Sequence, residues 1–133
     1  MASRPWPDDP QAFILAYLDA WNEADVDRVT DAFHVPSLIH TEGAVIEQLT
    51  GPSRLEFLGS YVDSTRDALD TGARWTCPSV EVKPLGLDAA LVTANWVFTQ
   101  VDGTVTEDYF DSYLLTLIGG RWYVLADAIH RAG

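Results

Sequence analysis

Asp111 is unusual because it interrupts a long apolar run. It lies within residues 104–117, where branched and aromatic residues are typical of a β-strand. Strands this apolar rarely carry an acid without a partner. Burial would raise the pKa of Asp111 and suit it to carry a proton, whereas pairing with Arg121, Arg74 or a backbone amide would make it structural. Both roles stay open, and the first makes Asp111 a candidate catalytic residue.

His40 is the second candidate for proton transfer. It lies in a short segment with a β pattern, residues 38–40. An imidazole with a pKa of roughly 6.5 can act as a general base or acid near neutral pH. The alternative is a structural or solvent-exposed histidine.

Strand alternation groups these acids with their neighbours. Asp111 shares a face with Tyr109, Tyr113 and Leu115, but a bulge in so long a strand would exchange its two faces, so the interior face stays open. Asp127 alternates against Trp122 and is expected to point outward.

Aromatic side chains are numerous enough to line a cavity for a flat apolar ligand, with core filling as the alternative for each. Tyr17 and Trp75 belong to this group, and the predicted ligand-binding residues are Trp21, Phe57, Tyr61, Trp96, Phe98 and Tyr113. The sequence contains no serine or cysteine triad, phosphate-binding glycine loop or metal-ligand motif. We therefore expect neither a metal nor a cofactor.

Three helices are expected in the first half of the chain. Asp9 followed by Pro10 predicts a first helix that ends near Asn22, and Asp25 can cap a short second helix whose face includes Phe33. Ser53 and Glu56 have the spacing of a capping box for a third helix, residues 53–69. Residues 1–9 are expected to be irregular.

Strands dominate the second half. Gly119 and Gly120 separate residues 104–117 from 121–129, and Asp102 with Gly103 separates 89–101 from 104–117, so two hairpins are predicted. Shorter strands are expected at 38–40, 44–49 and 74–83, the last interrupted by Pro78. Segregated helices followed by an antiparallel meander predict an α+β fold, with three helices packed on a curved sheet.

Composition limits the partners. The chain has 133 residues, enough for one domain spanning residues 1–133, and a formal net charge of −12. Such acidity argues against nucleic acid and anionic membranes as partners. Residues 1–7 lack the apolar stretch of a signal peptide, so a soluble, cytoplasmic protein is expected. The single cysteine, Cys77, cannot form an internal disulfide.

Several motifs in this order resemble the NTF2-like (SnoaL-like) superfamily of cone-shaped α+β barrels. The motifs are residues 17–22, residues 32–34, the Gly51-Pro52-Ser53 helix start, Asp102-Gly103, and residues 111–115 followed by Gly120-Arg121-Trp122. Within that superfamily the Asp-x-x-Leu-Leu, Gly-Arg-Trp and Phe-His elements are similar to the branch labelled lumazine-binding.

The resemblance implies possible roles and a homodimer. Ketosteroid isomerases of this superfamily use a tyrosine of the first helix as hydroxyl donor, and Tyr17 falls at that position. Their base position falls at about Thr41, beside His40, and their second acid falls near Ser112. Pairing through the outer face of the long strands is common among the members.

Two function classes follow. The first is binding of a small hydrophobic molecule in the cone without catalysis, since two of the three isomerase roles are not filled. The alternative is a cofactor-independent enzyme of the isomerase, dehydratase or cyclase type that uses general acid-base catalysis by His40, Asp111 and Tyr17.

Overall fold

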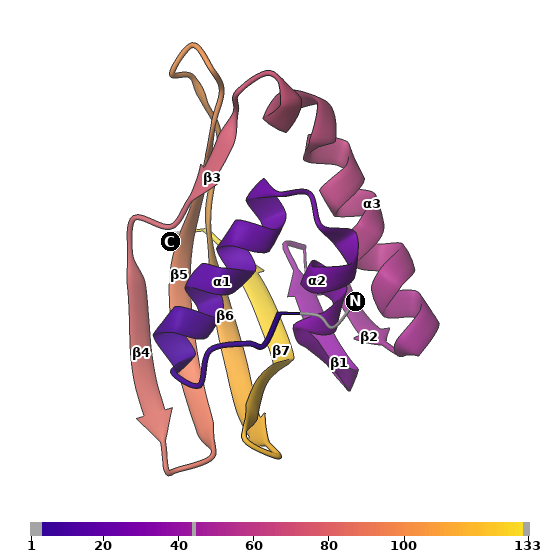
Figure 1. Cartoon of the computed structure of the whole chain (residues 1–133), viewed down its shortest axis with the longest axis vertical. Coiled ribbons are helices and arrows are strands. Elements are labelled where there is room, and N and C mark those ends of the chain that lie inside the picture. The colour runs from indigo at the N-terminus through magenta and orange to yellow at the C-terminus, as the bar shows by residue number, and fades with distance from the viewer. Residues whose placement is uncertain (1–3, 44, 132–133) are drawn as a thin grey trace.

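The computed structural model describes residues 4–43 and 45–131 (Figure 1). The helices are α1 (Pro10–Asn22), α2 (Val26–Asp31) and α3 (Gly51–Asp70). The strands are β1 (Phe33–Thr41), β2 (Val45–Leu49), β3 (Arg74–Thr76), β4 (Val80–Leu85), β5 (Ala89–Thr99), β6 (Val105–Ile118) and β7 (Arg121–His130).

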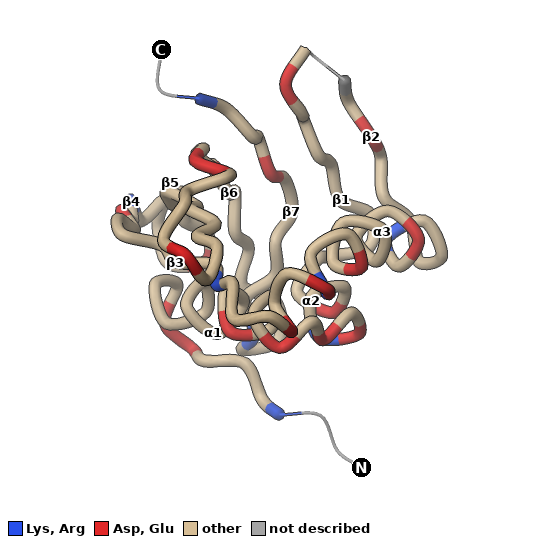
Figure 2. Tube along the Cα trace, turned by 90° about the horizontal axis from the view of Figure 1, so that it is seen from above, with Lys and Arg blue, Asp and Glu red and all other residues tan. Residues whose placement is uncertain are grey.

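The strands form one curved sheet that does not close on itself. Its order is β2-β1-β7-β6-β5-β3, with β4 also paired to β5. The β1–β7 pair is parallel and the other pairs are antiparallel. The three helices lie together against one side of this sheet (Figures 1 and 2). The α+β prediction is confirmed.

The helix starts follow local capping. The Asp9 side chain accepts the Ala12 N–H at 2.9 Å and begins α1, and the Asp25 side chain accepts the Arg28 N–H at 3.1 Å and begins α2. Both caps were predicted.

The predicted capping box of α3 is wrong. The helix begins two residues earlier than expected, because Thr50 is its N-cap and the Thr50 N–H donates to Ser53 Oγ at 2.7 Å. Pro52 lies in the first turn, where its missing N–H costs no helical hydrogen bond.

Strand β1 also differs from the expectation. It begins at Phe33, which was expected on the second helix, and not at residue 38. The pairing of β1 with β7 is irregular between Phe33 and Leu38, around Pro36, which has no N–H to donate. Of the predicted strand 44–49, residue 44 lies outside the described residues.

The two long hairpins are confirmed. Gly103 connects β5 to β6 with φ 90°, and Gly119 and Gly120 connect β6 to β7 with φ 57° and 78°. Such positive φ values are accessible to glycine without steric cost. Residues 77–79 interrupt the predicted strand 74–83, as Pro78 suggested.

The hydrophobic core fills the space between the helices and the sheet. Phe13 and Ile14 of α1, Val62 of α3 and Val92 of β5 are completely buried. Acidic residues are scattered over helices, strands and turns (Figure 2). No helix among the described residues is long and apolar enough to cross a membrane.

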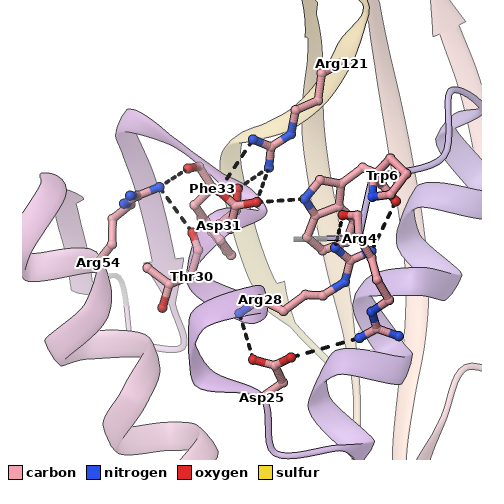
Figure 3. A network of polar contacts seen from close by, with 10 residues as sticks. Arg4, Trp6, Asp25, Arg28, Thr30, Asp31, Phe33, Arg54 and Arg121 are labelled. Carbon is pink, nitrogen blue, oxygen red and sulfur yellow. Dashed lines mark hydrogen bonds and ion pairs between the residues drawn. The ribbon is translucent and has the colours of Figure 1, made fainter. Parts of the chain in front are cut away.

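A polar network joins the N-terminal segment to α2, α3 and β7 (Figure 3). We call it the Asp31 network, and it comprises Trp6, Arg28, Asp31, Arg54 and Arg121. Asp31 Oδ2 accepts from Trp6 Nε1 at 2.9 Å and from Arg121 at 3.1 Å. Arg28 lies 3.8 Å over the Trp6 ring, and Arg54 donates to the backbone oxygens of residues 30 and 33. Residues 4–9 form no helix or strand, and this network fixes them to the domain. Residues 1–3 of the segment expected to be irregular lie outside the described residues.

Asp31→Ala should lower the free energy of unfolding by about 2 kcal/mol, because it removes a charged acceptor from both Trp6 and Arg121. Urea denaturation measures the change. Asp63→Ala is the matched control, since Asp63 makes an exposed ion pair with Arg66, and should cost less than about 0.5 kcal/mol. Equal effects of the two substitutions would contradict a structural role for the Asp31 network.

Candidate acid-base site

A cavity of about 670 Å³ lies on the helix side of the sheet. Charged and polar residues line its exposed end, where Arg131 Nε lies 2.8 Å from Glu42 Oε1. Aromatic residues line the deeper part and are Tyr17, Trp21, Trp75, Trp96, Tyr109 and Tyr113. The cavity therefore combines a polar mouth with an aromatic interior, as ligand sites commonly do.

Two buried acids, Asp111 and Asp127, line this cavity, and we call them the carboxyl pair. Each is 5% exposed. Asp111 of β6 is opposite Ile129 of β7, and Tyr113 is opposite Asp127, so the acids are diagonal neighbours on one face of the sheet. Their side chains are close enough to shift each other's pKa, and a hydrogen bond between the two carboxyl groups would require one of them to be protonated.

The expectation that Asp127 points outward is wrong, and a β-bulge is the reason. Leu114 is opposite Ala126, but Leu115 is opposite Val124, so Leu125 is an extra residue in β7. An extra residue exchanges the two faces of a strand beyond it. Val124 and Asp127 consequently both point into the molecule.

Burial raises the pKa values of both acids of the carboxyl pair above those of exposed aspartates. Burial raises the pKa of Asp111 to about 6, although its hydrogen bond with Asp127 opposes the rise. Burial and the negative charge of Asp111 raise the pKa of Asp127 well above its usual value. Both acids therefore keep their protons to a higher pH than an ordinary aspartate does.

Two tyrosine hydroxyls share the same interior. Burial, with the charges of the nearby acids, raises the pKa of Tyr17 and of Tyr113 well above 10.0. Their ring centroids are 6.1 Å apart in an edge-to-face contact. Both hydroxyls stay protonated at neutral pH and can donate hydrogen bonds.

The structure brings together most of the predicted residues. Asp111 and Tyr17 line the cavity, as do all six predicted ligand-binding residues: Trp21, Phe57, Tyr61, Trp96, Phe98 and Tyr113. His40 does not. Its neighbours Ile39 and Thr41 line the cavity, and strand alternation turns His40 to the opposite, exposed face. His40 is therefore the solvent-exposed histidine of the alternative, and its expected place with Asp111 and Tyr17 in one site is wrong.

The sequence did contain a signal for Asp127. It is an acid within an apolar strand, which is the reasoning that identified Asp111. No motif revealed the bulge that turns it inward. Among residues 4–43 and 45–131, no group of three or more His, Cys, Asp or Glu side chains is placed to hold a metal ion.

Comparison with known families identifies the fold. A family model described as NTF2-like protein (DUF6841) matches residues 8–132. The chain belongs to this NTF2-like family. The lumazine-binding branch is not confirmed, and no curated protein matches the sequence.

Solved structures share the NTF2-like fold at low sequence identity. A putative calcium/calmodulin-dependent protein kinase type II association domain from Thiobacillus denitrificans has a TM-score of 0.77 at 12% identity, over 98% of this chain and 100% of that one. An NTF2-like protein from Novosphingobium aromaticivorans has a TM-score of 0.70 at 13% identity, over 87% and 75%. An NTF2-like protein of unknown function from Shewanella oneidensis has a TM-score of 0.66 at 20% identity, over 91% and 98%. These similarities establish the fold alone.

Asp111→Asn should stabilise the protein relative to wild type as the pH rises. The folded-state pKa of Asp111 is raised from 3.8 to about 6, so the wild type loses stability as the pH rises between these values. The difference reaches about 3 kcal/mol above pH 6. Denaturation at pH 4 and pH 7.5 measures it, with Asp63→Asn as an exposed control. A substantial loss of stability in Asp111→Asn at pH 7.5 would show instead that Asp111 is a structural acid.

Proposed function

We propose that this protein is an enzyme that moves a proton on a small hydrophobic molecule by general acid-base catalysis. The carboxyl pair is the observation that carries the proposal. Two acids that share one proton supply a base and an acid at the same site. In this assignment Asp111 is the general base and Asp127 the general acid.

The surroundings of the pair support a catalytic role over a purely structural one. Oδ1 of Asp111 and Oδ1 of Asp127 are buried and have no hydrogen-bond partner among the described residues. An acid retained for stability normally pairs with a base or with backbone amides, because an unpaired buried polar atom costs about 1–3 kcal/mol. Among the described residues, neither Oδ1 atom has the base or amide partner of a structural acid, and both residues line the cavity.

The substrate is expected to be flat and mainly apolar. The aromatic rings provide stacking and edge contacts, and Tyr17 and Tyr113 supply neutral hydroxyl donors beside the acids. Proton transfer between a carboxyl group and such a substrate needs no cofactor. Binding without turnover is the alternative, and the experiment below separates the two.

Exchange of carbon-bound hydrogen tests the proposal. The probe is 2-tetralone, a flat two-ring ketone whose hydrogens beside the carbonyl exchange with deuterium by proton transfer. We expect the protein to accelerate exchange in deuterated buffer, measured by proton NMR. The rate should rise with pH as Asp111 loses its proton near pH 6, and fall at higher pH where Asp127 loses its own.

Three variants assign the effect. Asp111→Asn and Asp127→Asn should each lower the rate on the order of 10²-fold, because each removes one proton carrier. His40→Gln is the matched control and should leave the rate unchanged, since His40 lies outside the cavity. If 2-tetralone binds but exchanges no faster than in buffer, the protein is a binder and not a catalyst for this probe.

A homodimer through the outer face of the sheet belongs to the same proposal. Leu91 of β5 is 40% exposed on that face, opposite Leu114 of β6. The helices lie on the other side of the sheet and cannot cover these side chains (Figure 2). Apolar side chains left on a regular sheet face are well suited to an isologous contact.

Sedimentation velocity should give about twice the chain mass of 14.7 kDa at micromolar concentration. Leu91→Glu should shift the protein to monomers, because it places a charge within the interface. Leu87→Glu is the control, since Leu87 is 95% exposed in the turn before β5 and should not affect assembly. A wild-type monomer would remove this part of the proposal.

A further inference from the structure

The charged side chains that line the cavity are mostly acidic. Among residues 4–43 and 45–131 they are Glu42, Glu107, Asp111, Asp127 and Arg131. Arg131 lies at the exposed end, where its Nε is 2.8 Å from Glu42 Oε1 and its Nη1 donates to the Asp108 backbone oxygen at 2.9 Å. The arginine is therefore held at the mouth by partners of its own, and the interior contains the two acids of the carboxyl pair.

The carboxyl pair is buried apart from the basic side chains of the described chain. Neither Asp111 nor Asp127 forms an ion pair with any of those side chains. A charge on His130 lowers the pKa of Asp111, but strand alternation places His130 on the outer face of the sheet, where its Nε2 lies 2.9 Å from Ser112 Oγ. A negative charge on the pair therefore has no cation beside it within the cavity.

The other titratable groups of the described chain that interact with the pair are uncharged at neutral pH. They are the hydroxyls of Tyr17, Tyr109 and Tyr113 and the thiol of Cys77. Burial raises the pKa of each hydroxyl above 10.0 and that of the Cys77 thiol to about 12. These groups can donate hydrogen bonds, but they cannot balance the charge of an ionised acid.

Aromatic rings make up much of the cavity wall. Nine lining residues of the described chain are aromatic, and they are Tyr17, Trp21, Phe57, Tyr61, Trp75, Trp96, Phe98, Tyr109 and Tyr113. Trp96 and Asp111 are diagonal neighbours on the inner face, because Ala94 is opposite Asp111 and Trp96 is opposite Tyr109. Aromatic ring faces carry partial negative charge and attract cations, most strongly where water is excluded. The rings and the acids therefore favour the same ligand charge.

A metal ion does not match this site. The cavity volume is about 670 Å³, and no group of three or more His, Cys, Asp or Glu side chains within residues 4–43 and 45–131 is placed to hold a metal. Hard metal ions need several oxygen ligands at once. An organic cation needs a counter-charge and an apolar wall, and a molecule of drug size fits a cavity of this volume.

We infer that the cavity is a binding site for a hydrophobic amine in its ammonium form, with the positive charge at the carboxyl pair and the apolar frame among the aromatic rings. The inference rests on the small-molecule binding of the proposed function and names the charge of the ligand. A cation beside the pair offsets the cost of burying an ionised acid, and little water screens the attraction in such an interior. The same acids repel a carboxylate or phosphate ligand.

Binding of the amine is linked to the protonation of Asp111. Asp111 loses its proton near pH 6, so the pair gains a negative charge as the pH rises through that value. The affinity for the amine should therefore rise from pH 5 to pH 7.5. A bound ammonium group also lowers the pKa of Asp111, so binding near pH 6 should release protons into the buffer.

Isothermal titration calorimetry at pH 7.5 tests the ligand charge directly. The probes are 2-aminotetralin, 2-tetralol and tetralin-2-carboxylic acid, which attach an ammonium, a hydroxyl or a carboxylate group to the same carbon of one two-ring frame. The amine should bind at one site per chain and about tenfold more tightly than the alcohol, and the acid should bind more weakly than the alcohol. Equal affinities of amine and alcohol, or no binding of the amine, overturn the inference.

A double variant tests whether the carboxyl pair supplies the charge. Asp111→Asn with Asp127→Asn keeps the size of both side chains and removes both charges, so the preference for the amine over the alcohol should fall about tenfold. The matched control is Asp63→Asn with Asp67→Asn, which removes two exposed charges of α3 outside the cavity and should leave the preference unchanged. An equal loss in both double variants would mean that the net charge of the chain attracts the amine, and the inference fails.

Proton release provides a measurement on the unaltered protein. Near pH 6, the heat of binding of 2-aminotetralin should depend on the ionisation enthalpy of the buffer in the direction of proton release, and that of 2-tetralol should not. Amine binding that releases no proton, or an amine affinity that is equal at pH 5 and pH 7.5, overturns the inference.

The cation site and the proposed enzyme fail separately. A preference for the amine that depends on the carboxyl pair, without accelerated exchange of 2-tetralone, would keep the cation site and remove the enzyme proposal. Accelerated exchange that depends on Asp111 and Asp127, without a preference for the amine, would keep the enzyme and remove the cation site.

Discussion

One extra residue in β7 determines the chemistry of the cavity. Because Leu125 is inserted opposite the Leu114 and Leu115 positions of β6, the strand beyond it presents Asp127 inward beside Asp111. Without the bulge, alternation would place Asp127 in solvent and leave Asp111 as a lone buried acid. The insertion thus places a second carboxyl group beside the first in the buried interior. Bulges commonly re-aim a side chain, and this one turns Asp127 toward the cavity.

Burying the carboxyl pair lowers the stability of the folded protein, and the rest of the fold must offset this loss. Oδ1 of both acids has no partner among the described residues, and each unsatisfied group in such an interior costs about 1–3 kcal/mol. The acids lie on the paired strands β6 and β7, and β5 pairs with the other edge of β6. The Asp31 network joins the N-terminal segment to Arg121 at the start of β7. The strand pairing and the Asp31 network therefore offset part of the cost of burying the two acids.

Hairpins and helix starts could be predicted from the sequence, because each depends on a few neighbouring residues. Gly119-Gly120 and Asp102-Gly103 located the two long hairpins, because positive φ is a local requirement. Asp9 and Asp25 located two helix starts, because caps are local hydrogen bonds. An acid in an apolar strand identified Asp111. The errors at His40 and Asp127 concern which way a strand faces, which depends on its partner strand and on a bulge that no local pattern specifies. The start of α3 at Thr50 was missed because Ser53 can serve either as a cap or as a partner of one.

The most direct test of a shared proton is a carboxyl-carbon NMR titration of Asp111 and Asp127 in protein labelled with carbon-13 aspartate, with each signal assigned by its Asn variant. If the acids form the pair described here, one titration occurs near pH 6 and the other lies well above the ordinary range of aspartate, so that one proton remains on the pair at neutral pH. Two independent titrations near pH 4 would show that both acids are ionised and separately solvated, and would contradict the account.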